Sequence, residues 1–327
     1  MRLSYSPLDF PSLPPYFHAM RLKLFLKILL GLGFLGVAVT AYVFIRAFFL
    51  TDVSRMPLEN ELEEPIYVAS YAAGHEVFRK NQKTFAYSAL HKGIGFIFNY
   101  QHHLIDPAFL EKHKNVFAKR KGAGYWLWKP WVVMNTLKQI PENAYLIYCD
   151  GGFTFEKNPK PFLDLLKDHD MVVFAYGGPL GSHCKPSALI KTHTNTEAGR
   201  KSPALLGGVL FMKNTPTTRH FVGQWLKYCE DDDLLLYEDG PGNAHRADES
   251  MLAVTYFHNP KGVFVIKGTE KIMYDYLRYH HRHPAAEDQS LMFKLDNGTR
   301  GWERRLVDSD FFKQVAKWIY KASRNTP

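Results

Sequence analysis

The sequence predicts an α/β protein with a mostly parallel β-sheet, helices on both faces of that sheet, and one transmembrane helix before it. Three observations lead to this prediction: short apolar runs typical of buried strands, helical patterns between several of them, and one long uncharged segment near the amino terminus. Strands that are apolar on both faces and separated by helices are typical of parallel sheets buried between two helical layers.

The expected strands are rich in β-branched and aromatic residues. They cover residues 66–70, 93–100, 144–150, 171–176, 205–212 and 262–267. The helices expected between them cover residues 128–139, 161–168, 217–230 and 246–257. In sheets of this kind ligands bind at the carboxyl ends of the strands, so the polar residues that end these runs are the first candidates for a functional site.

The segment from residue 28 to residue 45 contains no charged residue, and its 18 residues are long enough to cross most of a hydrocarbon core. Residues 47–50 extend it past Arg46, whose side chain can reach the interface. Basic residues precede the segment and acidic residues follow it, which places the amino terminus in the cytoplasm. A cleaved signal peptide and a buried core helix are the alternatives that remain open.

This anchor divides the chain into four parts. We expect a cytoplasmic tail over residues 1–27, a signal-anchor helix over 28–50, a stem over 51–64 and a single α/β domain over 65–327. The stem is expected because its residues are polar, acidic and interrupted by Pro57. The chain is thus predicted to be a single-pass membrane protein.

The net charge of +9 does not favour a nucleic-acid partner. Residues 1–55 carry +4, because they hold six basic and two acidic residues, and the remaining 35 basic and 30 acidic residues contribute only +5. A diffuse excess of this size, without a basic run interleaved with aromatic residues, suits a small ligand that carries phosphate. The three cysteines show neither zinc-site spacing nor a disulfide framework.

The expected strand over residues 144–150 ends in Asp150, which is followed by Gly151 and Gly152. A carboxylate at the edge of a buried strand, beside glycines that permit close approach of the backbone, suits a diphosphate and its divalent cation. An aspartate that opens a turn is the structural alternative, and it is favoured when this motif is taken alone.

The segment over residues 119–131, KRKGAGYWLWKPW, combines three tryptophans with cations and two glycines. Its Trp126 and Trp128 offer aromatic faces for a base or a sugar, and Lys129 offers a positive charge for phosphate. An aromatic-rich helix start, with Pro130 near its first turn, is the structural alternative.

Two later segments carry further candidates. Gly207 and Gly208 lie within an expected strand that resembles the glycine-containing strand beside the donor sugar in a known enzyme group described below. Asp248 and Glu249 fall in the first turn of an expected helix, where the helix dipole favours anions and where an aspartate can simply cap the helix. Arg246 is a candidate phosphate clamp or an ion-pair partner of Asp150.

These segments together resemble a known enzyme group. The order G-x-G-Y-W-x-W-K-P, then Y-L-I-Y-x-D-x-G, then H-R-x-D-x-S-x-L is similar to GT-A-type glycosyltransferases of the capsular and surface-polysaccharide group. That group is distantly similar to the glycogenin-like and α-mannosyltransferase families. The resemblance extends over about residues 65–285. It implies a GT-A-like catalytic domain that moves a sugar from a nucleotide-diphosphate donor to a hydroxyl group of a glycan or lipid-linked acceptor.

The resemblance also assigns roles to residues. Asp248 and Glu249, the latter in place of the family's glutamine, become the catalytic or orienting carboxylates. The nucleotide-sugar is expected to contact Trp126, Trp128, Lys129, Asp150, Gly207, Gly208 and Arg246.

In the similar families an acidic motif at a strand end, often D-x-D, holds a divalent metal and the nucleotide-sugar diphosphate. Here Asp150 matches only the first acid, and Gly152 stands at the second. By analogy, Mn²⁺ is the expected cofactor, with Asp150, His280 and His281 as ligands. A solvated basic loop and a patch that contacts phosphate are the alternatives for the two histidines.

The predicted topology fits a Golgi lumen in a eukaryote. In a bacterium the protein is expected in the inner membrane, with the reverse orientation, because donors are scarce on the far side. The triplet Asn297-Gly298-Thr299, an acceptor for N-glycosylation, is compatible with a lumenal domain. Two other functions remain open: a membrane-tethered carbohydrate-binding domain without turnover, and a metal-dependent phosphodiesterase or hydrolase.

Overall fold

The computed structural model describes residues 36, 38–39, 41–42, 66–74, 76–89, 92–237, 244–267, 273 and 275–279. The predicted tail and stem, most of the predicted anchor, and the histidines at 280 and 281 lie outside these residues. Across the part that is described, no helix has both the length and the apolar character needed to cross a bilayer.

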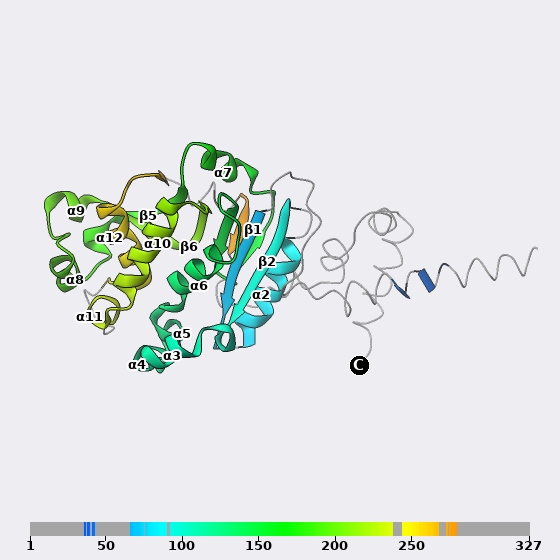
Figure 1. Cartoon of the computed structure of the whole chain (residues 1–327), viewed down its shortest axis with the longest axis horizontal. Coiled ribbons are helices and arrows are strands. Elements are labelled where there is room, and N and C mark those ends of the chain that lie inside the picture. Colours follow the sequence, from blue (N-terminus) through cyan, green and yellow to red (C-terminus); the bar gives the residue numbers. More distant parts are fainter. Residues whose placement is uncertain are drawn as a thin grey trace, which may run out of the picture.

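The centre of the molecule is a six-stranded sheet with the order β2-β1-β3-β6-β5-β7 (Figure 1). Its strands are β1 (Ile66–Ala72), β2 (Ile94–Gln101), β3 (Tyr145–Cys149), β5 (Met171–Pro179), β6 (Pro203–Lys213) and β7 (Val263–Ile266). Each of the six expected runs forms one of these strands. The neighbouring pairs that exclude β6 are parallel, so the prediction of a mostly parallel sheet is confirmed.

Strand β6 is antiparallel to both of its neighbours, β3 and β5. The chain leaves β5 at Pro179 and re-enters the sheet at Pro203, directly opposite. Two short helices, α8 (Pro186–Lys191) and α9 (Glu197–Lys201), lie within this connection. Because the connection returns at the same end of the sheet, the next strand must run the other way.

Helices cover both faces of the sheet, as predicted (Figure 1). One face packs against α6 (Trp128–Leu137), α10 (Pro216–Cys229) and α12 (Asp248–His258). The opposite face packs against α2 (Glu76–Ser88) and α7 (Lys160–Asp164). Side chains of β3 alternate between the two layers, since Leu146 and Tyr148 belong to the first core and Ile147 and Cys149 to the second.

The remaining elements are short. Near the aromatic residues of segment 119–131 and the four acids at 230–233 lie α3 (Pro107–Lys112), α4 (Lys114–Phe117), α5 (Gly122–Tyr125) and α11 (Asp232–Leu235). A separate two-stranded sheet pairs β4 (Phe153–Phe155) with β8 (Leu277–Tyr279). The helix expected over residues 161–168 is the short α7 followed by a 3₁₀ turn over Leu165–Lys167.

Candidate active site

Asp150 follows the carboxyl end of β3, and its side chain lies on the same face of the sheet as Tyr148. The Tyr148 hydroxyl donates a hydrogen bond of 2.6 Å to Asp150 Oδ1. Burial, together with the charge of Asp150, raises the pKa of Tyr148 well above its ordinary value, so the hydroxyl remains a donor. The backbone N–H of Asp150 donates to the carbonyl of Gly208 at 2.9 Å, which fixes the strand end to β6. The carboxylate therefore does more than open a turn.

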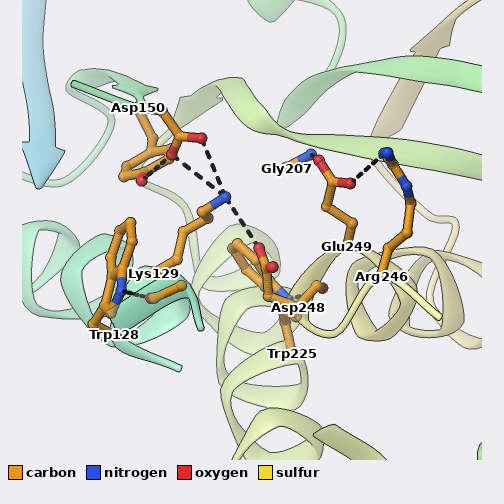
Figure 2. Close-up of polar contacts among 10 residues, drawn as sticks. Trp128, Lys129, Asp150, Gly207, Trp225, Arg246, Asp248 and Glu249 are labelled. Atoms are coloured by element: carbon orange, nitrogen blue, oxygen red, sulfur yellow. Dashed lines mark hydrogen bonds and ion pairs between the residues drawn. The ribbon is translucent and has the colours of Figure 1, made fainter. Parts of the chain in front are cut away.

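Lys129, in the first turn of α6, lies between two carboxylates (Figure 2). Its ammonium nitrogen is 3.4 Å from Asp150 Oδ1 and 3.1 Å from Asp248 Oδ2, and the residue is only 2% exposed. Burial alone would lower the pKa of Lys129. The charges of Asp150, Asp248 and Glu249 outweigh that effect and hold the pKa above its ordinary value, so the side chain is an ammonium ion.

Asp248 begins α12 but does not cap it. The N-cap is Ala247, at φ 45°, and no side chain satisfies the helix start there. The Asp248 carboxylate instead turns toward Lys129, and its backbone carbonyl accepts a hydrogen bond of 2.8 Å from the Trp225 indole. The residue is 2% exposed, and burial raises the pKa of Asp248 to about 7 against the opposing charge of Lys129.

The Asp248 Oδ2 atom is buried and lies 3.1 Å from the Lys129 ammonium. From the rest of the described chain it accepts no hydrogen bond. A buried carboxylate oxygen that is compensated by a single lysine is a candidate for a functional group.

Glu249 links α12 to strand β6 and to Arg246. One carboxylate oxygen accepts the backbone N–H of Gly207 at 2.9 Å, and the other lies 3.1 Å from an Arg246 nitrogen (Figure 2). The Arg246 guanidinium lies over the Tyr176 ring, 3.9 Å from its centroid. Arg246 thus pairs with Glu249 rather than with Asp150, and its role as a phosphate clamp stays a prediction.

The two glycines of β6 allow this close packing. A Cβ atom on Gly207 would lie 3.0 Å from Glu249 Cγ and 3.1 Å from Asp248 Oδ2. A Cβ atom on Gly208 would lie 3.2 Å from Asp150 Oδ2. A side chain at either position would therefore require the neighbouring carboxylates to shift by a few tenths of an ångström.

The aromatic residues around the start of α6 pack both against the core and against each other. The Trp128 ring stacks on Tyr71 at 4.0 Å, and its indole N–H donates to the carbonyl of Gly122 at 2.9 Å. Trp126 adopts a left-handed backbone at φ 58°, with its ring over Gly122. Trp128 thus supports the start of α6 from within the core, and stacking of Trp126 on a base or sugar stays a prediction.

The metal prediction has one described ligand, Asp150, since the two histidines lie outside the described residues. Among the described His, Cys, Asp and Glu side chains, no three come together in a group able to hold a metal ion. The acidic run after α10 is structural: Asp231 accepts the backbone N–H of Asp233 at 3.0 Å and lies 2.8 Å from the Lys191 ammonium.

The structure brings most of the predicted site residues into one row (Figure 2). Along this row lie Asp150, Lys129, Asp248, Gly207, Glu249 and Arg246. The sequence did not lead us to predict that Tyr148 donates to Asp150 or that Tyr176 lies against Arg246. The contact of Tyr148 could have been predicted, because a residue two positions before Asp150 in a strand lies on the same face.

Comparisons with known proteins found solved structures that align with about 70% of this chain. No family model matches the sequence, and no curated protein matches it. A solved structure of mouse xyloside xylosyltransferase 1 aligns with 70% of this chain and 93% of its own, at 10% identity and a TM-score of 0.41. A glycosyltransferase involved in glycosylation of the major capsid of PBCV-1 aligns over 69% and 98%, at 12% identity and a TM-score of 0.41.

A third structure is the galactosyltransferase LgtC in complex with donor and acceptor sugar analogues. It aligns with 68% of this chain and 82% of its own, at 14% identity and a TM-score of 0.36. At these identities and TM-scores, the function has to be argued from the site itself.

Proposed function

We propose that the chain is a glycosyltransferase of the GT-A type, which moves a sugar, in our proposal a hexose, from a nucleotide-diphosphate donor to a hydroxyl group of a glycan or lipid-linked acceptor. One observation carries the proposal. The Lys129 ammonium joins Asp150 and Asp248 at the carboxyl end of β3. These three residues come from the three separate segments whose order resembles the GT-A-type enzymes.

Solvent reaches two charged groups of this site, and we assign donor contacts to them. The Asp150 side chain is 27% exposed and the Arg246 side chain is 36% exposed. Asp150 accepts hydrogen bonds from donor hydroxyl groups, and the free N–H groups of Arg246 meet phosphate oxygens. The diphosphate gains negative charge as it leaves, so a cation in this place stabilises the transition state more than the ground state.

Asp248 is the proposed proton acceptor. As the acceptor oxygen bonds to the anomeric carbon, the bond from that carbon to the diphosphate breaks, and the nucleoside diphosphate leaves with the electron pair. The hydroxyl proton passes to Asp248, whose pKa of about 7 suits a base at neutral pH. Because Asp248 is 2% exposed, this step requires the residues that cover it to move when substrate binds.

The proposal includes the membrane topology. An anchor over residues 28–50 would hold the catalytic domain on the side of the membrane opposite the amino terminus. In a eukaryote this is the Golgi lumen.

A carbohydrate-binding domain without turnover is the second candidate. The burial of Asp248 and the glycine at position 152, in place of an acid, favour it. Hydrolysis of the donor in the absence of acceptor separates the two functions, because a binding domain leaves the donor intact.

The test is a panel of nucleotide-sugars offered to the full-length chain in detergent, with and without Mn²⁺, and read out as nucleoside diphosphate released. We expect one donor to be hydrolysed, and we expect the rate to fall at least about 100-fold in Asp150→Asn and in Asp248→Asn. The control is Asp164→Asn, the same change at a carboxylate on α7 that is 42% exposed. Binding without hydrolysis would support the second candidate, and an unchanged rate in both site variants would refute the site.

A further inference from the structure

The place between the carboxylates of Asp150 and Asp248 is filled by an ammonium group. Lys129 Nζ lies within ion-pair distance of both, and its side chain is 3% exposed. Beyond this pair, Glu249 carries a third negative charge, which is already matched by Arg246 and by the N–H of Gly207. Each carboxylate of the site therefore has a cation of the protein beside it.

A divalent metal does not fit this arrangement of donor atoms. Mn²⁺ and Mg²⁺ bind oxygen ligands at about 2.0–2.2 Å and need several of them. Asp150 Oδ1 already accepts the short hydrogen bond from Tyr148, and both oxygens of Asp150 lie within 3.5 Å of the Lys129 ammonium. A dication at the same carboxylate would meet the repulsion of that ammonium at short range.

The backbone after Asp150 offers no second acid. Gly152 is buried, and the chain continues at once into β4, which pairs with β8. The sequence prediction of Mn²⁺ at Asp150 therefore disagrees with the local geometry.

We propose that Lys129 takes the place of the divalent cation, so that this site binds the nucleoside diphosphate of its donor without a metal ion. The part of this inference that concerns the donor rests on the proposed function. The part that concerns the metal rests only on the position of the ammonium between two carboxylates.

The electrostatic consequence is direct. A bare Asp150 at the strand end would repel a diphosphate, and in a metal-dependent site the dication reverses that charge. Here the buried ammonium, which Asp150 shares with Asp248, offsets part of the charge of Asp150 from behind, and the exposed edge of Arg246, whose other side pairs with Glu249, lies at the far end of the row (Figure 2). An ammonium fixed by two ion pairs loses no entropy when the donor arrives.

The first experiment uses Mn²⁺ alone and needs no donor. We expect the full-length chain in detergent to show no site-specific Mn²⁺ binding by electron paramagnetic resonance. Lys129→Met should acquire one Mn²⁺ site, because it leaves two neighbouring carboxylates without a cation. Adding Asp248→Asn to that variant should abolish the new site, and Lys201→Met, at an exposed lysine, should match the wild-type chain.

The wild-type chain alone tests whether the site binds Mn²⁺, so the experiment remains informative even if Lys129→Met fails to fold. Stoichiometric Mn²⁺ binding that Asp150→Asn removes would overturn the inference. A folded Lys129→Met chain that binds no Mn²⁺ would also count against it.

The second experiment measures the Kd of uridine diphosphate by calorimetry, as a probe for the donor, in EDTA and in Mn²⁺. Equal Kd values within about twofold support metal-independent binding, whereas binding at least tenfold tighter in Mn²⁺ overturns it. If neither uridine diphosphate nor the other common nucleoside diphosphates bind in either condition, the proposed function fails. The Mn²⁺ experiment still decides whether Lys129 excludes a metal.

Discussion

At the scale of single residues, Asp248 is informative because burying its carboxylate is energetically unfavourable. Its carboxylate is buried, its Oδ2 has the Lys129 ammonium as its polar partner in the described structure, and its pKa is raised to about 7. A residue selected only for stability would be replaced by one that needs no compensation. The unfavourable burial of Asp248 is therefore expected to serve the reaction.

The raised pKa of Asp248 predicts that the free energy of unfolding depends on pH. In the unfolded chain Asp248 loses its proton near pH 3.8, and in the folded chain near pH 7. Between these values the folded state binds more protons, so the free energy of unfolding falls as the pH rises. Asp248→Asn should remove this loss, which we expect to be roughly 1–3 kcal/mol between pH 4.5 and 7.5. Chemical denaturation of both proteins at the two pH values measures it.

His245 titrates in the same range with the opposite sign. Burial, aided by the charge of Lys185, lowers the pKa of His245 to about 4, so its contribution to stability grows as the pH rises from about 4 to 6.5. Because both proteins contain His245, the difference between them isolates Asp248. Parallel stability curves for wild type and Asp248→Asn would contradict the account.

Glu249 gives a second prediction at this scale. Glu249→Gln keeps an acceptor for the Gly207 N–H but turns an amide group toward the Arg246 guanidinium. We expect a stability loss of about 0.5–1 kcal/mol, because the pair is partly exposed, and a rise in the KM of the donor of about tenfold. Denaturation and donor kinetics check it, with Glu197→Gln as the exposed control. A fall in kcat with an unchanged KM would place Glu249 at the reacting atoms instead of behind Arg246.

At the scale of elements, strand β6 is the surface on which the site is assembled. Asp150 pairs with it through the backbone, and α12 packs its first turn against Gly207. The glycines matter here for space, because neither of them has a positive φ.

Gly208→Ala should therefore push Asp150 out of place. Its new Cβ would lie 3.2 Å from Asp150 Oδ2 and 3.3 Å from the Phe153 ring. We expect donor hydrolysis to fall at least about tenfold and stability to fall by about 1–2 kcal/mol. Gly177→Ala on β5 is the matched control, since its Cβ would meet no atom within 4 Å. Equal activity in the two variants would show that the strand does not set the position of Asp150.

The sequence predicted the strands well because each carries an apolar run, and this holds even for the edge strand β7, whose residues are only partly buried or exposed. It did not predict that β6 runs antiparallel, since the direction of a strand depends on where its connection returns. It also missed α2, whose sequence EVFRKNQKTFAYS mixes lysine, arginine and glutamate with few aliphatic residues.

The site was predictable as a set of residues but not as a geometry. The pairing of Asp150 with Lys129 joins positions 21 residues apart, and the partner of Arg246 was left open between a phosphate and Asp150. These pairs form only when α6 and α12 pack on the sheet. That packing places Lys129 beside two carboxylates and Arg246 beside Glu249.

At the scale of the whole molecule, the predicted anchor leads to a further test. Residues 28–45 are uncharged, and each aspartate placed near the centre of a membrane helix costs roughly 2.5–3.5 kcal/mol. We expect the full-length chain to stay in the membrane pellet after alkaline carbonate extraction. The double variant Leu35→Asp and Val39→Asp should move to the supernatant. Release of the unmodified chain would contradict the anchor.

The central claim is that the donor binds at the row of charges from Asp150 to Arg246. An experimental structure of the full-length chain with bound uridine diphosphate, or with whichever nucleoside diphosphate binds, tests it most directly. The account predicts phosphate oxygens in hydrogen-bonding distance of Arg246 and a ligand hydroxyl in contact with Asp150. A nucleotide bound elsewhere, with Asp150 and Arg246 untouched, would contradict it.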